Sequence, residues 1–298
     1  MKIAVSKSVL VGLAILVSGC SSPSPTRVAK ARYTTYIVPH SGLTPQERAW
    51  VDKNCPFGEP ILSSPEDIGA TQIIARNGYV LEHSATDKTS LWVCEWVQKS
   101  DINGSGNRNK SNFAPDPSLP VGSRAELEDY ARSGYDRGHQ APAADHTSSQ
   151  RETDETFYLS NMAPQKPALN RDIWANLESK VRNIVKKEGA AYVITGGLFY
   201  DPKEDSPATA DGLVEYKTIG KDAVSVPTHF YKIIVYEDDG NWKATAYVLE
   251  NRKYGQSESL DQQIRTIDWV EERAGIDFMP KLSDLEERDL ESRKGTPL

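Results

Sequence analysis

The chain has 298 residues, of which 38% are hydrophobic and 26% are charged, and its formal net charge at pH 7 is −7. This acidic balance excludes a broad basic surface of the kind that coats nucleic acid non-specifically, although it is compatible with a small basic site beside a metal ion. A folded part of about 250 residues fits one large domain or two small ones.

Residues 1–19 are expected to be a signal peptide. Lys2 and Lys7 give a positively charged start, and residues 9–17 form an apolar run that is too short to span a bilayer as a helix. The following "VSGC" resembles a lipobox, which implies that Cys20 is the lipid-bearing first residue of the mature protein. The alternative is a signal peptide that is cut after a small residue, with no role for Cys20.

An acylated Cys20 would tether the protein to a membrane without any spanning helix. Ser21 is similar to the outer-membrane sorting pattern, so the expected location is the periplasm or the cell surface, with the lipid in the outer membrane. Residues 20–42 then form a lipidated and flexible tether, because their Ser- and Pro-rich start has no apolar period. The loss of Lys2 and Lys7 changes the formal net charge from −7 to −9.

Cys55 and Cys94 remain once Cys20 carries lipid. An even pair outside the cytoplasm favours a disulfide, which would close a loop of about 40 residues and stabilise the fold by about 3–4 kcal/mol. The alternative is two unlinked cysteines, one of them buried. No Cys/His spacing in the chain indicates a structural zinc site.

The folded part is expected to begin with a short helix at 43–54. Thr44 can cap this helix, Pro45 suits its first position, and Glu47 is three residues after the cap, which together make a capping box.

Further strands and helices follow along the chain. The predicted strands are 79–85 and 89–98, which form a hairpin, then 156–165 running into a turn, 190–200, and the two arms of a hairpin at 228–251. The predicted helices are 124–134, 169–189 and 266–276, each with a glycine at its end. A long loop covers 100–123, and residues 286–298 form a charged, solvated tail. These elements make an α+β domain over 43–285, with mostly antiparallel strands and a few helices against them.

The second arm of the first hairpin carries Trp92, Cys94 and Trp96 on one face, because strand side chains alternate. These tryptophans are expected to pack in the core.

Three polar stretches in the middle of the chain could carry chemistry. They are "DRGHQAP" at 136–142, "YLSNMAPQ" at 158–165 and "LNRDIWANLE" at 169–178. In the last of these, Asn170, Trp174 and Glu178 recur at every fourth position and are expected to share one helix face. Because Mg²⁺ takes oxygen ligands and keeps several waters, Asn170 could bind it directly and Glu178 could hold a metal-bound water.

His139 would supply a base to such a site. The ordinary pKa of imidazole is about 6.5, so a neutral fraction can accept a proton from water at neutral pH. A general base and an oxygen-bound Mg²⁺ suffice for phosphodiester hydrolysis. Arg108 and Arg137 could hold phosphate oxygens, because guanidinium matches phosphate bidentately. Singly, such residues are usually solvated side chains or helix caps; their ordered combination indicates a site.

These motifs resemble the DNA/RNA non-specific endonuclease family. The resemblance is carried by "YDRGHQAPAAD", "YLSNMAPQKPALNRDIWANLE" and "YVITGGLFY", and weaker similarity extends it to roughly residues 55–283. It implies the ββα-metal (His-Me finger) fold, with a central, mostly antiparallel sheet flanked by helices.

The resemblance also implies a role for each matching residue. By motif, His139 would be the general base, Asn170 the direct Mg²⁺ ligand, Glu178 the holder of a metal-bound water, Arg108 a stabiliser of the transition state, Arg137 a contact near the scissile phosphate, Asn161 a support of the site and Asp136 a buttress of the loop.

We therefore expect a lipid-anchored, Mg²⁺-dependent endonuclease that hydrolyses DNA and RNA, with Mn²⁺ able to substitute. Two alternatives stay open: a surface lipoprotein that binds nucleic acid without cutting it, and a phosphodiesterase acting on small or cell-wall phosphodiesters. The acidic charge argues against the first, because capture without chemistry depends more on phosphate contacts. The protein could be a homodimer, although no feature of the sequence decides its oligomeric state.

Overall fold

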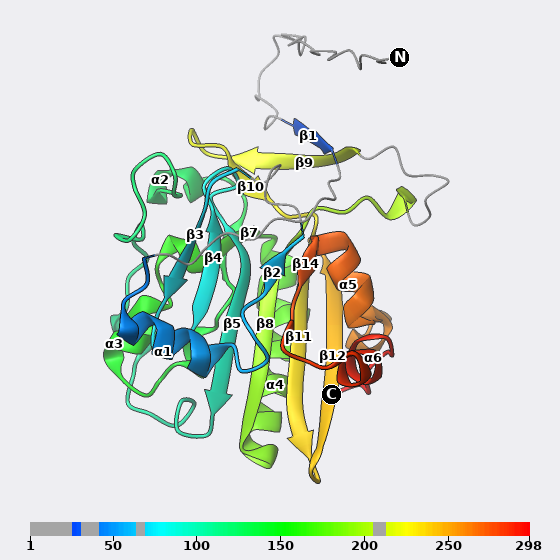
Figure 1. Ribbon diagram of the computed structural model, residues 1–298. Coiled ribbons are helices and arrows are strands. Elements are labelled where there is room, and N and C mark those ends of the chain that lie inside the picture. The colour runs from blue at the N-terminus through cyan, green and yellow to red at the C-terminus, as the bar shows by residue number, and fades with distance from the viewer. Residues whose placement is uncertain (1–25, 31–41, 64–68, 205–212) are drawn as a thin grey trace, which may run out of the picture.

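The computed structural model describes residues 26–30, 42–63, 69–204 and 213–298, which form an α+β architecture around one large sheet (Figure 1). Within these residues the central sheet has seven strands in the order β13-β12-β11-β8-β5-β4-β3, and all neighbours are antiparallel. The strands are β3 Thr71–Ala75, β4 Val80–Ser84, β5 Ser90–Gln98, β8 Ala190–Leu198, β11 His229–Asp238, β12 Asn241–Glu250 and β13 Ile264–Arg265. The predicted sheet is confirmed.

Helices cover both faces of this sheet. They are α1 Pro45–Asn54, α2 Leu127–Tyr130, α3 Gln150–Glu155, α4 Trp174–Glu188, α5 Ile267–Ala274 and α6 Asp284–Glu291. Side chains of β11 alternate between two cores: Tyr231 and Ile233 join the core that also contains residues of α5, and Phe230 and Ile234 join the core under α4. The sheet is therefore a wall between two hydrophobic layers.

Shorter elements surround the central sheet. The smaller pairings are β6 Asp136–His139 with β7 Met162–Gln165, β2 Ile61–Leu62 with β14 Ile276–Asp277, and β9 Leu213–Ile219 with both β1 Thr26–Lys30 and β10 Val224–Val226. Single helical turns are η2 Arg108–Lys110, η3 Ala143–Asp145, η4 Leu159–Asn161, η6 Pro202–Glu204 and η7 Leu260–Gln263, and η5 Leu169–Ile173 is a turn of π-helix.

The predicted first helix and its capping box are confirmed at α1. The backbone N–H of Glu47 donates to Thr44 Oγ1 at 3.2 Å, and the Glu47 carboxylate accepts from the Thr44 N–H at 2.7 Å. The reciprocal bonds satisfy two backbone donors that the first helical turn leaves without partners.

The two predicted hairpins are also confirmed. The pair β4 and β5 places Trp92, Cys94 and Trp96 in a single core cluster. The pair β11 and β12 runs in continuous register from His229↔Glu250 to Asp238↔Asn241.

Three predicted segments differ from the structure. Residues 26–30, expected within a flexible tether, form β1, because the edge of β9 offers unpaired backbone groups to them. The strand predicted at 156–165 is confined to β7 and is preceded by the single turn η4. The helix predicted at 124–134 is only the four residues of α2, and Gly134 lies beyond it with φ 80°.

The predicted disulfide is not formed in this structure. Cys55 and Cys94 are free and buried thiols, and the Cys94 sulfur lies 3.1 Å from the Tyr192 hydroxyl. Burial, followed by the neighbouring Cys94, raises the pKa of the Cys55 thiol. Because thiol–disulfide exchange proceeds through the thiolate, this dry setting slows oxidation of the pair.

The C-terminal segment is less solvated than predicted. Helix α6 packs against α5 and β12, and its last residue, Glu291, is buried. Beyond α6, the Thr296 carbonyl accepts a hydrogen bond from Thr245 on β12. The charged sequence of this segment gave no sign of these contacts.

The lipidation prediction at Cys20 falls outside the described residues. In the part of the chain that the structure describes, no helix has the length and apolar character needed to cross a bilayer.

Candidate active site

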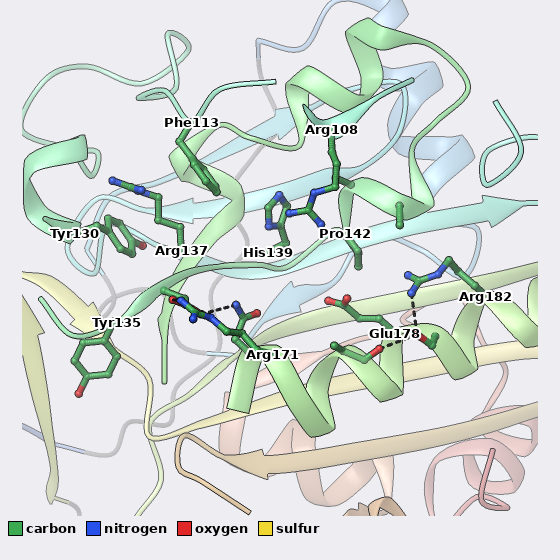
Figure 2. Close-up of a pocket in the computed structure, with 16 residues that line it drawn as sticks. Arg108, Phe113, Tyr130, Tyr135, Arg137, His139, Pro142, Arg171, Glu178 and Arg182 are labelled. Carbon is green, nitrogen blue, oxygen red and sulfur yellow. Dashed lines mark hydrogen bonds and ion pairs between the residues drawn. The ribbon is translucent and has the colours of Figure 1, made fainter. Parts of the chain in front are cut away.

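A two-stranded ribbon and a helix form the walls of one cavity. Strands β6 and β7 pair from Asp136↔Gln165 to His139↔Met162, and the chain then continues through η5 into α4. The cavity between them has a volume of about 570 Å³ (Figure 2). Its walls include Arg108, Phe113, Tyr130, Asp136, Arg137, His139, Asn170, Arg171, Glu178 and Arg182. Residues from 108–113, 130–144 and 170–182 thus meet at one pocket. Of the three predicted stretches, 136–142 and 169–178 line it, and 158–165 does not.

His139 ends β6 and faces this cavity between two aromatic rings. Its ring centroid is 4.9 Å from that of Phe157, in an edge-on arrangement, and 5.8 Å from that of Phe113. Burial, with the positive charge of Arg108 and then His146, lowers the pKa of His139 to about 3. The imidazole is therefore neutral at physiological pH and has a lone pair with which to accept a proton.

The two ring nitrogens of His139 are not equivalent. Nε2 is buried and has no hydrogen-bond partner among the described residues. Nδ1 is consequently the nitrogen better placed to meet a water in the cavity.

Asn170 lines the same cavity as His139 and is held by Asp136. Its amide nitrogen donates to Asp136 Oδ2 at 3.0 Å. Arg171 donates two hydrogen bonds to the same carboxylate, at 2.8 Å from Nε and at 2.6 Å from Nη2. Burial alone would raise the pKa of Asp136, but the bonds from Arg171 and Asn170 outweigh it and lower that pKa. Asp136 therefore stays ionised and keeps the amide nitrogen of Asn170 turned toward itself.

Glu178 lies on α4, two turns beyond Asn170, with its carboxylate toward the same cavity (Figure 2). No hydrogen bond from the described residues reaches this carboxylate. Burial raises the pKa of Glu178 to about 7, against the lowering effect of Lys232. Lys232 is itself buried on β11, where its Nζ donates to Thr195 Oγ1 at 2.5 Å. The ammonium group behind Glu178 favours the ionised carboxylate.

The cavity is locally basic although the chain is acidic. Of the described residues, four arginines and two carboxylates line it. Arg137 is fixed by stacking, with its guanidinium carbon 5.0 Å from the Phe113 ring centroid and 5.6 Å from that of Tyr130. Arg108 lies 5.9 Å from the Phe157 ring centroid and is otherwise exposed. Both predicted arginines therefore stand where a phosphate in the cavity would meet them.

Asn161 supports the cavity from behind and does not line it. Its Oδ1 accepts from the Ala141 N–H at 2.9 Å, and its Nδ2 donates to the carbonyls of Ala141 and Thr156, both at 2.9 Å. The side chain is fully buried. These bonds fix the backbone just after His139, which is the supporting position that the sequence suggested for Asn161.

One predicted feature of the helix is wrong. Asn170 and Glu178 line the cavity, but Trp174 is fully buried in the core under α4 and does not share their face. The turn of π-helix over Leu169–Ile173 has more residues than an α-helical turn. This turn changes the angular position of Asn170 relative to the residues of α4. Residues at every fourth position therefore no longer share one helix face.

Sequence reasoning missed three residues of the site. Arg171 holds Asp136, and Arg182 donates to Asp145 Oδ1 at 2.9 Å while lining the cavity. Lys232 lies behind Glu178. Arg182 could have been found by continuing four residues beyond Glu178, and Lys232 as the one cation inside the apolar run "HFYKIIVY". Arg171 carries no comparable signal.

The donors present suit a hard divalent cation. Asn170 Oδ1 accepts no hydrogen bond from the described residues, because its partner amide nitrogen faces Asp136. Together with the open carboxylate of Glu178, this gives two oxygens on one side of a polar cavity. Such a set, completed by water, is of the kind that Mg²⁺ takes.

The comparisons with known proteins agree with this geometry. Residues 60–285 match the family model described as DNA/RNA non-specific endonuclease. The chain is 38% identical over 215 residues to mitochondrial endonuclease G of Bos taurus, which covers 72% of this chain and 71% of that protein. It is 39% identical over 233 residues to a nuclease of Syncephalastrum racemosum, covering 75% and 72% of the two chains.

A solved structure shows the same fold. A chain of the crystal structure of the EndoG/EndoGI complex superposes with a TM-score of 0.69 at 35% identity, covering 78% of this chain and 92% of that one.

Proposed function

The chain belongs to the DNA/RNA non-specific endonuclease family, and on that premise we propose that this nuclease hydrolyses phosphodiester bonds in both DNA and RNA with His139 as general base and Asn170 as the direct ligand of one Mg²⁺. The relatives are themselves nucleases. The alternative of a lipoprotein that binds nucleic acid without cutting it is therefore set aside.

The observation that carries this proposal is that His139, from β6, and Asn170, from η5, line one cavity. The imidazole is neutral, and Asp136 turns the amide nitrogen of Asn170 away, which leaves an oxygen for a cation. A base for water and an oxygen ligand for the metal thus flank a space of a size that a phosphodiester can enter.

Each wall residue then has a task. Nδ1 of His139 would take a proton from the attacking water, and the low pKa of the free imidazole would rise when a phosphate anion offsets the charge of Arg108. Arg108 and Arg137 would hold the phosphate oxygens bidentately. Mg²⁺, when bound, supplies stabilisation of the negative charge that develops on the phosphoryl and leaving oxygens.

Replacement of the base tests the proposal directly. His139→Ala should lower the rate of plasmid nicking by about 10²–10⁴-fold, because a lost general base costs about that much. Plasmid and RNA should be assayed side by side with Mg²⁺ and again with EDTA, which should stop cleavage of both by the wild-type protein.

The control outcomes separate the parts of the proposal. Undiminished nicking by His139→Ala would remove the base assignment while leaving the metal in place. Cleavage that persists in EDTA would contradict the proposed dependence on Mg²⁺. Faster turnover of a small phosphodiester such as bis(p-nitrophenyl) phosphate than of plasmid would favour the phosphodiesterase alternative.

A further inference from the structure

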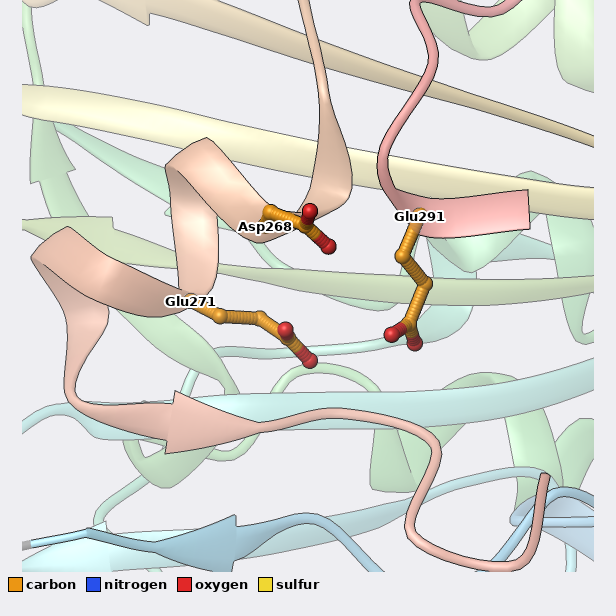
Figure 3. Close-up of side chains that lie close together, drawn as sticks. All are labelled: Asp268, Glu271 and Glu291. Carbon is orange, nitrogen blue, oxygen red and sulfur yellow. The ribbon is translucent and has the colours of Figure 1, made fainter. Parts of the chain in front are cut away.

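A second group of carboxylates lies on the face of the central sheet opposite to α4. Asp268 and Glu271 project from α5, whose apolar residues belong to the core on that face, and Glu291 ends α6 beside them. Figure 3 shows the three side chains pointing toward one another. One oxygen from each lies within 4.8 Å of the oxygens of the other two. No residue of this group takes part in the nuclease chemistry proposed above.

Glu291 is the unusual member of the group. Its residue is only 1% exposed, and neither carboxylate oxygen has a hydrogen-bond partner among the described residues. A buried carboxylate without donors loses its hydration and gains no hydrogen bond in return, which destabilises its ionised form. Such a side chain in a native fold calls for an unseen partner.

The surroundings make the partner positive. Burial and four neighbouring carboxylates, Glu271, Glu287, Asp277 and Asp268, raise the pKa of Glu291 to about 9. Burial likewise raises the pKa of Glu271 to about 7, and Glu271 already accepts a hydrogen bond from the Phe278 N–H at 2.8 Å. So much negative charge in one half-buried place is stable only with added protons or with a bound cation.

From this geometry we propose that Asp268, Glu271 and Glu291 form a binding site for a hard divalent cation, Ca²⁺, that fastens α6 to α5. Carboxylate oxygens are the ligands that such ions take, and the exposed side of Asp268 leaves room for the waters that complete the shell. Ca²⁺ takes 6–8 oxygen ligands with several carboxylates among them, whereas Mg²⁺ usually keeps several waters and binds only one or two carboxylates. Three protein carboxylates in one group therefore suit the larger ion.

The site would act on the C-terminal segment. Glu291 is followed by residues whose backbone contacts β12 and finally α4, where the Lys180 ammonium donates to the Leu298 carbonyl. A cation between α5 and α6 would therefore hold the start of a segment that crosses to the helix carrying Glu178. Its expected effect is on stability, since no group of the active-site cavity contacts the cluster.

Calcium titration of the metal-free protein tests the site. After EDTA treatment and dialysis at pH 7.5, CaCl₂ is added in a calorimeter and, separately, in a thermal melt. We expect one Ca²⁺ per chain in Asn170→Ala, which lacks the active-site ligand. At a Ca²⁺ concentration 100-fold above the dissociation constant, the melting temperature should rise by about 5–10 °C.

Two matched variants complete the experiment. Glu291→Gln should lose the calcium-dependent rise and keep nicking activity in Mg²⁺ within twofold, and its melting temperature in EDTA should be no lower than wild type, because the amide carries no charge. Glu287→Gln, an exposed residue one turn earlier on α6, should keep most of the rise. A wild-type melt that does not respond to 10 mM Ca²⁺, or a full response in Glu291→Gln, would overturn the proposal. The carboxyl groups would then be stabilised by protons that they share and not by a cation.

Discussion

Asp136 decides which end of the Asn170 carboxamide faces the cavity. An ionised carboxylate can only accept hydrogen bonds, so the group 3.0 Å from Asp136 Oδ2 must be the amide nitrogen of Asn170. Arg171 keeps Asp136 ionised by two further bonds. The orientation of the Asn170 carboxamide oxygen thus follows from the chemistry of its neighbours. A metal that binds this oxygen would find the side chain already oriented.

Glu178 should make the metal requirement depend on pH. Burial raises its pKa to about 7, so the carboxyl is increasingly protonated below that pH and is a poorer acceptor for water around the metal. We expect the Mg²⁺ concentration for half-maximal nicking to rise by up to about fivefold between pH 7 and pH 6, and to change little between pH 8 and pH 9. Activity measured over a Mg²⁺ series at each pH gives this value.

The control for this pH dependence is Glu178→Gln, which should need more Mg²⁺ at every pH and show a flat profile. In the substrate-free protein His139 does not titrate in this range, because its pKa is lowered to about 3. Asp145, whose pKa burial raises to about 6, is unchanged in that variant. If the Mg²⁺ requirement of Glu178→Gln still rose on acidification, Asp145 and not Glu178 would be the titrating group.

At the scale of elements, the β6–β7 ribbon holds His139 and requires a glycine beside it. A Cβ at Gly138 would lie 2.0 Å from Gln165 Oε1 and 2.4 Å from its Cδ. Gln165 is fully buried, so its side chain has little room to move aside. The glycine of "DRGH" is thus explained by close packing across the ribbon.

Gly138→Ala should destabilise the protein and lower its rate of nicking. Forcing a methyl group into a packed core costs about 1–3 kcal/mol, which is about 2–12 °C in melting temperature for a domain of this size. Nicking should fall as well, because the shift reaches the adjacent His139. Melting and nicking are measured together.

Two further variants isolate the clash at Gly138. Gly255→Ala is the matched control, because its new Cβ would meet only Glu258 Oε2, at an ordinary 3.5 Å. Gly138→Ala combined with Gln165→Ala removes the side-chain atoms of Gln165 that clash with the new methyl group. This double variant should recover part of the lost activity. An unaltered single variant would mean that the ribbon tolerates the methyl group.

Most elements could be predicted because local signals agreed with the final packing. The capping box at Thr44, the glycines after α4 and α5, and the turn at Asp238–Asn241 all appear in the structure as expected. The segment 156–165 failed because its apolar residues fit a strand, whereas the Asn161 N–H donates to the Tyr158 carbonyl at 3.0 Å and closes a single turn. A strand-like contact is made only as an isolated bridge between Tyr158 and Ala114. Such a long-range pairing leaves no periodicity in the sequence.

The site was predictable only as far as its motifs reach. His139 and Asn170 were found because their spacing to other polar residues is distinctive, and both line the cavity. The phase of Trp174 was wrong because a π turn cannot be recognised from spacing that assumes 3.6 residues per turn. Lys232 acts from a strand far along the chain, through a contact that only the folded sheet creates.

For the whole molecule, the distribution of charge matters more than its sum. The chain has a net charge of −7, yet four arginines and only two carboxylates line the described part of the catalytic cavity. Acidic side chains gather instead around α5 and α6, across the sheet. This arrangement favours the approach of a polyanion to one face and opposes broad adhesion elsewhere, so binding is expected to be confined to the cavity.

The N-terminal sequence bears on where the protein is located. We propose that Cys20 carries lipid and that residues before β1 connect it to the fold, because "VSGC" follows a short apolar run. Two acyl chains suffice for stable anchoring, whereas one does not. Expressed with its signal, the wild-type protein should partition into the detergent phase of a Triton X-114 extraction, and Cys20→Ser should not. Mass spectrometry of the N-terminal peptide measures the added lipid. Recovery of the wild type in the aqueous phase, with an unmodified N-terminus, would instead establish ordinary signal-peptide cleavage and a freely diffusing nuclease.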